Sequence, residues 1–116
     1  MSSGAVYDAV KTSSIASEFT YGSQAESRYG KRYGSIVVLS FLVKGGTANN
    51  TTLVTIPNDL LPAQNDYIYS LYFGNGSVCT TGSVWIEASD VTKIKYYGSS
   101  ALSANAYVSI IYGLSV

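Results

Sequence analysis

The chain contains a single tryptophan, Trp85, and an acidic residue, Glu87, follows it two positions later. If the flanking Val84 and Ile86 face a core, the alternation of side chains along a strand places Trp85 and Glu87 together on the outside. An exposed indole ring can stack on the apolar face of a pyranose, and a carboxylate beside it can accept hydrogen bonds from the sugar hydroxyls. The pair is therefore a candidate saccharide platform. The alternative is that Trp85 packs in the core or at an interface between subunits.

Tyrosine is the second chemical signal, because the chain has eleven tyrosines against three phenylalanines. A tyrosine side chain combines a large rigid ring with a polar tip and loses little conformational entropy on binding. As a set, the tyrosines indicate an interaction surface, directed either toward another subunit or toward a ligand. Any single one could equally fill the rim of a β core.

Several classes of chemistry are excluded by residues that are missing. Histidine is absent, which removes Ser-His-Asp and Cys-His catalysis and the usual general base at neutral pH. Cys79 is the only cysteine, so the chain can form neither an internal disulfide nor a cysteine-rich zinc site. Cys79 lies in a strand-like stretch, where we expect a small buried side chain. We predict no metal and no cofactor.

Paired carboxylates could still hydrolyse a glycosidic bond, and the chain offers Asp59, Asp66, Glu87 and Asp90. That reaction depends on the separation of two carboxyl groups, which a sequence does not give. The chain also lacks the glycine-rich loop that cradles phosphate and the acidic loop that binds calcium. We predict that the protein is not an enzyme and has no catalytic residue.

Only 12% of the residues are charged, compared with about 25% in ordinary globular domains, while 47% are hydrophobic. The seven basic and seven acidic residues cancel, which gives no indication of nucleic-acid binding and suits a carbohydrate ligand. No apolar run approaches the roughly 18 residues of a membrane-spanning helix, so we expect no membrane insertion. The composition is typical of a small β protein with a Ser, Thr, Asn and Tyr surface, of an obligate oligomer, or of both.

The most strongly patterned stretch is Ile36–Val43, a nearly uninterrupted apolar run that ends at Lys44-Gly45-Gly46. Short runs rich in β-branched residues and bounded by glycines indicate buried strands. An antiparallel strand with one face in water should alternate between apolar and polar side chains, and here only Ser40 interrupts the apolar pattern. The second face must therefore be covered by another sheet or by another chain.

Strand patterns recur about every ten residues. We expect a loop around Gly30, tight turns at residues 45–50 and 74–76, Leu60 and Leu61 closing one end, and strands at residues 18–21, 26–29, 36–43, 52–56, 66–73, 78–80, 83–88, 91–97 and 106–112. This spacing predicts an all-β fold, an antiparallel β-sandwich or jelly roll, for residues 18–116. Residues 1–17 are expected to form an N-terminal connector.

The order of several motifs resembles a known family. The long apolar strand, a glycine turn and a short strand precede the loop Pro57-Asn58-Asp59-Leu60-Leu61-Pro62. After this loop come two similar strand starts, Gly76-Ser77-Val78 and Gly82-Ser83-Val84-Trp85-Ile86. Residues 107–112 form a closing strand. Over roughly residues 30–116 this order resembles the C-terminal head domains of tailed-phage tail-fibre and baseplate receptor-binding proteins. The sequence departs from the family pattern at Leu60 and Leu61, where an aromatic and a basic residue are usual.

The resemblance implies a homotrimeric, non-catalytic head at the tip of a phage tail, made in the host cytoplasm. Such a head attaches the virion to saccharide on the host cell surface and contacts other tail or baseplate proteins. The resemblance makes Trp85, Glu87 and Asp90 the candidate saccharide-binding residues, in a cleft between subunits, and residues 1–17 the neck where a fibre stalk enters. Two alternatives stay open: a structural virion or tail-assembly module that binds only protein, and a free-standing lectin-like module.

Overall fold

The computed structural model describes residues 12–115, which form one antiparallel sheet of nine strands. The strands are β1 (Thr12–Ser14), β2 (Thr20–Tyr21), β3 (Ala25–Tyr33), β4 (Ile36–Val43), β5 (Thr51–Thr55), β6 (Tyr67–Phe73), β7 (Val78–Glu87), β8 (Asp90–Gly98) and β9 (Ala106–Gly113). Two 3-10 turns, η1 (Ala16–Glu18) and η2 (Asn58–Leu60), lie in the connections. In space the strands follow the order β1-β3-β4-β9-β6-β7-β8-β5-β2. No helix between residues 12 and 115 could span a membrane.

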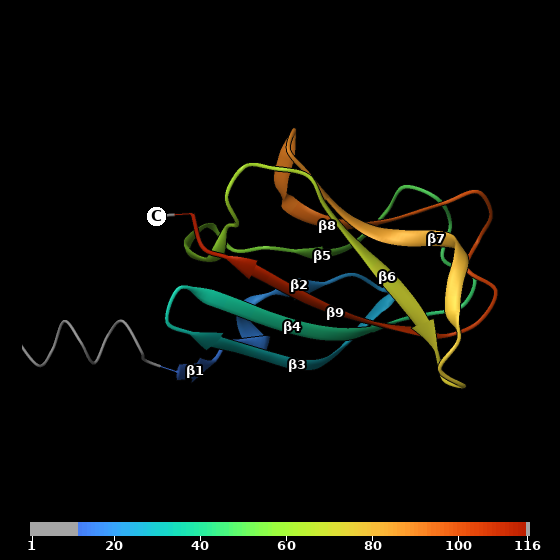
Figure 1. Ribbon diagram of the computed structural model, residues 1–116, viewed down its shortest axis with the longest axis horizontal. Coiled ribbons are helices and arrows are strands. Elements are labelled where there is room, and N and C mark those ends of the chain that lie inside the picture. Colours follow the sequence, from blue (N-terminus) through green and yellow to red (C-terminus); the bar gives the residue numbers. More distant parts are fainter. Residues whose placement is uncertain (1–11, 116) are drawn as a thin grey trace, which may run out of the picture.

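The sheet curls until its two ends approach each other. One half consists of β3, β4 and β9, the other of β5, β7 and β8, and β6 crosses between them (Figure 1). Where the ends meet, a turn connects β2 to β3, and in this turn the Ala25 N–H donates to the Gly22 carbonyl (3.2 Å). The ring of Tyr21 contacts the ring of Phe41 edge to face. The predicted all-β, antiparallel, sandwich-like fold is confirmed.

The core lies inside the curl, and alternate residues of each strand enter it. On β4, Val37, Leu39, Phe41 and Val43 are fully buried. The same cluster contains the inward residues of the opposite half and of β9, namely Val84, Ile86, Ile94, Tyr96, Val108 and Ile110. Burial of one face of the sheet by its own curvature therefore gives the domain its core.

The outer side of β4 and β9 is not covered by a second layer within residues 12–115. Ile36 is 41% exposed and Ile111 is 59% exposed. Only Leu42, at the far end of β4, is buried on this side. Of the two kinds of cover that the sequence predicts for this face, another sheet of the same chain is not found, and cover by another chain stays a prediction.

The strand β3 runs straight through Gly30, where the sequence predicts a loop. Ala16 of η1 packs against the backbone there, and a Cβ at Gly30 would come 2.7 Å from the Ala16 Cα. Glycine at this position therefore permits close packing and does not mark a turn. The strand predicted at residues 26–29 is confirmed and continues on both sides as the longer β3.

A second glycine, Gly82, also lies inside a strand, and the strands predicted at residues 78–80 and 83–88 are the single strand β7. Gly82 pairs with Gly98 of β8. The fully buried ring of Tyr96 occupies the inner side of both glycines, and its hydroxyl donates to the Ser100 carbonyl (2.9 Å). Because neither glycine has a side chain, the ring can lie directly against the two backbones.

The first strand, β1, pairs with β3, and Ile15 after it is buried. Residues 1–11, most of the predicted connector, lie outside the described residues, so the boundary at residue 17 stays a prediction. Glu18 belongs to η1, which shortens the strand predicted at residues 18–21 to Thr20–Tyr21.

Both ends of the described chain lie at one end of the domain, beside the β3–β4 turn (Figure 1). Thr12 pairs with Tyr33, and the Leu114 N–H donates to the Ser35 carbonyl (2.8 Å). Leu60 is buried at the same end, where its carbonyl accepts a hydrogen bond from the Tyr112 hydroxyl (2.6 Å). The prediction that Leu60 closes one end of the core is confirmed.

We expect Gly82→Ala to lower the free energy of unfolding by about 1–3 kcal/mol, because an added methyl group would overpack the buried Tyr96 ring. Denaturant titration of the purified protein measures the change. Gly74→Ala is the matched control, since no atom lies within 4 Å of its Cβ position. Equal stability of the two variants would contradict this account of the Gly82–Gly98 pair.

Two tyrosines, the half-buried Tyr69 and the buried Tyr112, predict a loss of stability at high pH. Burial raises the pKa of Tyr69 from 10.0 to about 12 and also raises the pKa of Tyr112. Because the folded state disfavours ionisation, the stabilisation from these hydroxyls is complete below the unfolded pKa and is lost as pH rises through the folded pKa. The free energy of unfolding should therefore fall between about pH 10 and pH 12. Denaturant titrations at several pH values should show a shallower fall for Tyr69→Phe, and an identical fall would refute this assignment.

Candidate functional site

Trp85 lies on the outer side of β7, as the sequence predicts, because Val84 and Ile86 on either side of it are fully buried. The indole ring is half-buried and fixed by two contacts. Its Nε1–H donates to the Ser83 hydroxyl (2.6 Å), and its ring meets the Tyr97 ring of β8 edge to face, with 5.6 Å between centroids. The ring is therefore held in one orientation before any ligand arrives.

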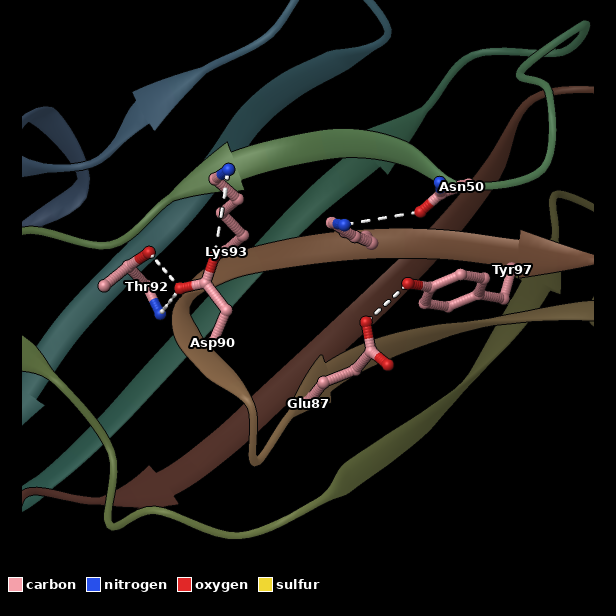
Figure 2. Close-up of polar contacts among 7 residues, drawn as sticks. Asn50, Glu87, Asp90, Thr92, Lys93 and Tyr97 are labelled. Carbon is pink, nitrogen blue, oxygen red and sulfur yellow. Dashed lines mark hydrogen bonds and ion pairs between the residues drawn. The ribbon is translucent and has the colours of Figure 1, made fainter.

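Glu87 is on the same side of β7, but its carboxylate is already engaged. The Tyr97 hydroxyl donates to Glu87 Oε1 at 2.5 Å (Figure 2). This hydrogen bond is the main reason that the pKa of Tyr97 is raised, with desolvation and the nearby negative charge adding to it. Trp85, Tyr97 and Glu87 thus form a connected row across β7 and β8, in which Glu87 positions Tyr97.

Asp90 begins β8 and is satisfied locally at the β7–β8 turn. Its Oδ1 accepts hydrogen bonds from the Thr92 hydroxyl (2.5 Å) and the Thr92 N–H (3.1 Å), while Lys93 Nζ lies 3.7 Å from Oδ2 (Figure 2). The two hydrogen bonds, with a smaller effect of the lysine charges, lower the pKa of Asp90. The Lys93–Asp90 ion pair is exposed and adds little to stability. Asp90 therefore holds the turn.

A shallow hollow of about 580 Å³ lies beside Trp85. Trp85 and Tyr97 form its aromatic side. Gly82 of β7 and Gly98 of β8, which pair with each other over the Tyr96 ring, also line the hollow. The remaining lining residues are Asn49, Cys79, Thr80, Thr81, Ser83 and Ser99, none of which is charged. An aromatic face beside hydroxyl and amide groups can bind a neutral, polyhydroxylated ligand by stacking and hydrogen bonding.

The three residues predicted from sequence are separated by this geometry. Trp85 lines the hollow. Glu87 does not line it but accepts a hydrogen bond from Tyr97, which does, and Asp90 lies at the β7–β8 turn, outside the hollow. Sequence reasoning missed Tyr97 and Ser83. Alternation within residues 91–97 places Tyr97 on the outer side of β8, but the register that brings it beside Trp85 is not readable from the sequence.

Cys79 is 6% exposed, which confirms the prediction of a small buried side chain. Its sulfur lies 3.6 Å from the Thr81 hydroxyl. Within residues 12–115, no group of three or more acidic or cysteine side chains is placed to hold a metal ion.

Lys95 is the cross-strand neighbour of Trp85, and its Nζ donates to the Asn50 side chain (3.3 Å). Asn50 has a positive φ of 67°, in the left-handed region that asparagine tolerates better than most residues. The neighbouring Asn49 accepts a hydrogen bond from the Gly98 N–H (3.1 Å). The loop before β5 is thus fastened to β8 at the rim of the hollow.

Comparison with known proteins gives one informative result. No protein-family model matches the chain, and no curated protein matches it in sequence. Among solved structures, the chain is similar to the receptor binding protein (gp15) of Listeria phage PSA, with a TM-score of 0.64 and 16% sequence identity over 97% of this chain and 71% of that chain. At this identity the likeness shows a shared fold.

We expect Ser83→Ala to free the indole ring without disturbing β7, because the lost hydrogen bond contributes about 0.5–1.5 kcal/mol. Fluorescence reports this directly, since Trp85 is the only tryptophan. Quenching by acrylamide should increase and fluorescence anisotropy should fall. Ser70→Ala, at the adjacent position on β6, is the control. If both variants behave like the parent protein, the Ser83 hydroxyl does not fix the ring.

Proposed function

We propose that the chain is the receptor-binding head of a tailed-phage tail fibre or baseplate and attaches the virion to saccharide on the host cell surface. The fold shared with the receptor binding protein of a Listeria phage supports a receptor-binding role of this kind. The placement of the hollow supports it too. The start of β7 and the end of β8, which line the hollow, lie at the opposite end of the domain from the β3–β4 turn, where both described chain ends are found (Figure 1).

The fixed Trp85–Tyr97 pair beside an uncharged, hydroxyl-lined hollow is the observation that carries the saccharide assignment. In this proposal the apolar face of a sugar ring stacks on Trp85, and the hydroxyls of Thr81 and Ser83 exchange hydrogen bonds with the sugar. Glu87 acts indirectly by holding Tyr97, and Asp90 by holding the β7–β8 turn. Because the rings are already ordered, little conformational entropy is lost on binding.

We propose a binding role without catalysis. Glycoside hydrolysis needs one carboxyl group that stays protonated to act as an acid. The hydrogen bonds from Thr92 lower the pKa of Asp90, which favours the opposite, ionised form. Glu87, its partner in the strand register, is engaged by the Tyr97 hydroxyl. This pair is therefore arranged to support the strands.

The proposal includes a homotrimer at the tail tip of the virion, assembled from chains made in the host cytoplasm. Residues 1–17 would be the neck, and other tail or baseplate proteins would be further partners. Weak individual sites then act together, because several heads on one virion raise the effective concentration of saccharide. The uncovered outer side of β4 and β9 supports association with other chains.

Two alternatives make different predictions. A structural tail-assembly module would bind another tail protein and leave cells unlabelled. A free-standing lectin-like module would label cells but bind no tail component. Labelled protein tested on host cells and on isolated tail proteins separates these possibilities.

Trp85→Ala should weaken binding to bacterial cells about thirtyfold, because truncating a central aromatic anchor costs about 2 kcal/mol or more. The protein is displayed on streptavidin beads, so that many copies act together whatever its oligomeric state. Cells of a strain panel that begins with Listeria, and cell-wall polysaccharide isolated from the strains that bind, serve as probes. Addition of that polysaccharide to free protein should change the Trp85 fluorescence.

Thr55→Ala is the control, because Thr55 is exposed on β5 and does not line the hollow. Retention of full cell binding by Trp85→Ala would overturn the saccharide site. Binding of no strain in the panel, together with capture of a tail protein, would favour the structural module.

A further inference from the structure

Seven exposed large hydrophobic side chains share the outer side of four neighbouring strands, β3, β4, β9 and β6. We call this surface the outer apolar face: Tyr29, Tyr33, Ile36, Ile68, Tyr72, Tyr107 and Ile111. The strand register makes it continuous. Across the strands, Val38 of β4 lies between Lys31 of β3 and Ile111 of β9. In the same way, Tyr107 of β9 lies between Leu42 of β4 and Tyr72 of β6.

Three of the four strands, β4, β6 and β9, contain no charged residue at all, as their sequences IVVLSFLV, YIYSLYF and AYVSIIYG show. The outer sides of β7 and β8, in contrast, present Glu87, Lys93 and Lys95. The solvent side of an antiparallel sheet is normally polar. The part of the face without charge is therefore that of β4, β9 and β6, while β3 at its edge carries Glu26, Arg28, Lys31 and Arg32.

The area of this face lies at the upper end of what a solitary domain usually exposes. Its tyrosines are 36–51% exposed and its isoleucines 41–59%. With about 150–250 Å² for a fully buried aromatic side chain, the tyrosines alone present roughly 350 Å². The three isoleucines add roughly 250 Å², so the whole face is on the order of 600 Å², at the upper limit of the roughly 300–600 Å² of the largest patch on a typical monomer.

Four hydroxyls within the face are already paired with one another. The hydroxyls of Ser40 and Ser109 lie 2.9 Å apart at its centre, and those of Tyr29 and Tyr33 lie 2.6 Å apart. The Arg28 guanidinium stacks over the Tyr107 ring, 4.9 Å from its centroid. A partner can therefore cover the face without leaving these hydroxyls unsatisfied.

A groove of about 480 Å³ between β6 and β9 gives the face a concave part, lined by Ile68, Tyr69, Ser70, Tyr72, Tyr107 and Ser109. Tyr29, Tyr33 and Ile36 are exposed on the other side of the face, on β3 and β4. The face therefore has two different parts. A head-to-tail contact repeated by rotation would place one part of one copy against the other part of the next copy.

We propose that the outer apolar face binds a second copy of this chain, with the β3–β4 part of one copy against the β9–β6 part of the next, so that the contact closes into a ring. This inference rests on the homotrimer proposed above and assigns the surface that forms it. A second copy suits the face because the uncharged strands β4, β6 and β9 are best matched by an equally uncharged surface. In a ring each copy makes two contacts, one with each part of the face, so that the whole face is covered.

Light scattering across a range of concentrations tests the assignment with the full chain. The parent protein should have the mass of three chains. Ile111→Arg should reduce it to one chain, weakening association at least a hundredfold, because a charge would be buried without a partner. Thr55→Arg adds the same charge at an exposed position on β5 and should remain trimeric. Circular dichroism checks the fold of each variant, and Ile68→Arg, at a position 57% exposed on β6, replaces Ile111→Arg if that variant does not fold.

The outcomes separate this inference from the proposed function. An Ile111→Arg protein that remains trimeric would overturn the assignment of the face while leaving the trimer intact. A parent protein that is monomeric at every concentration would overturn both, whereas cell binding by beads tests receptor attachment independently. A two-chain parent dissociated by Ile111→Arg would support the face and replace the trimer with a dimer.

Discussion

A single hydrogen-bonded sheet has two faces, and this chain has no helix layer to cover either of them within its described residues. Curling hides one face, and the turn from β2 to β3 joins the last strand of the order to the second. The inward residues of both halves then form one core. Close packing is required inside so narrow a curl, which accounts for glycine at positions 30, 82 and 98, where another backbone or a buried ring comes close. The outward face has no such cover within residues 12–115.

The two halves of the outer surface differ in chemistry because they differ in sequence. On β7 and β8 the outward residues are polar and aromatic, and each is tied to a neighbour: Trp85 to Ser83, Tyr97 to Glu87, Asp90 to Thr92. Such a surface suits a small, wet ligand, since its groups are ordered and still partly accessible. On β4, β9 and β6 the outward residues are mostly apolar, and the hydroxyls of Ser40 and Ser109 bond to each other. That surface suits a large, dry partner.

Much of the fold could be predicted from the sequence, because alternation and turn chemistry are local. Ile36–Val43, the turn at residues 74–76 and the orientation of Trp85 were all predicted. Gly30 and Gly82 were misread, because a glycine that permits close packing and a glycine that permits a turn look the same without knowledge of the neighbours. The site was predicted only in part. Trp85 is recognisable by its residue type, whereas the role of Tyr97 depends on the pairing of β7 with β8. Glu87 bonds to Tyr97 and Asp90 bonds to Thr92, and this difference depends on the turn between the two acidic residues.

The position of the chain ends also determines how the domain would carry a mechanical load. Thr12 and Leu114 are both bonded beside the β3–β4 turn, and the start of β7 and the end of β8, which line the hollow, lie at the opposite end of the domain (Figure 1). Tension between these two points would run along β3, β4 and β9, parallel to the strands. Their hydrogen bonds would then be loaded in shear, many at once, and could not be opened one after another from an edge. A domain with this layout would resist pulling much better than its modest size suggests.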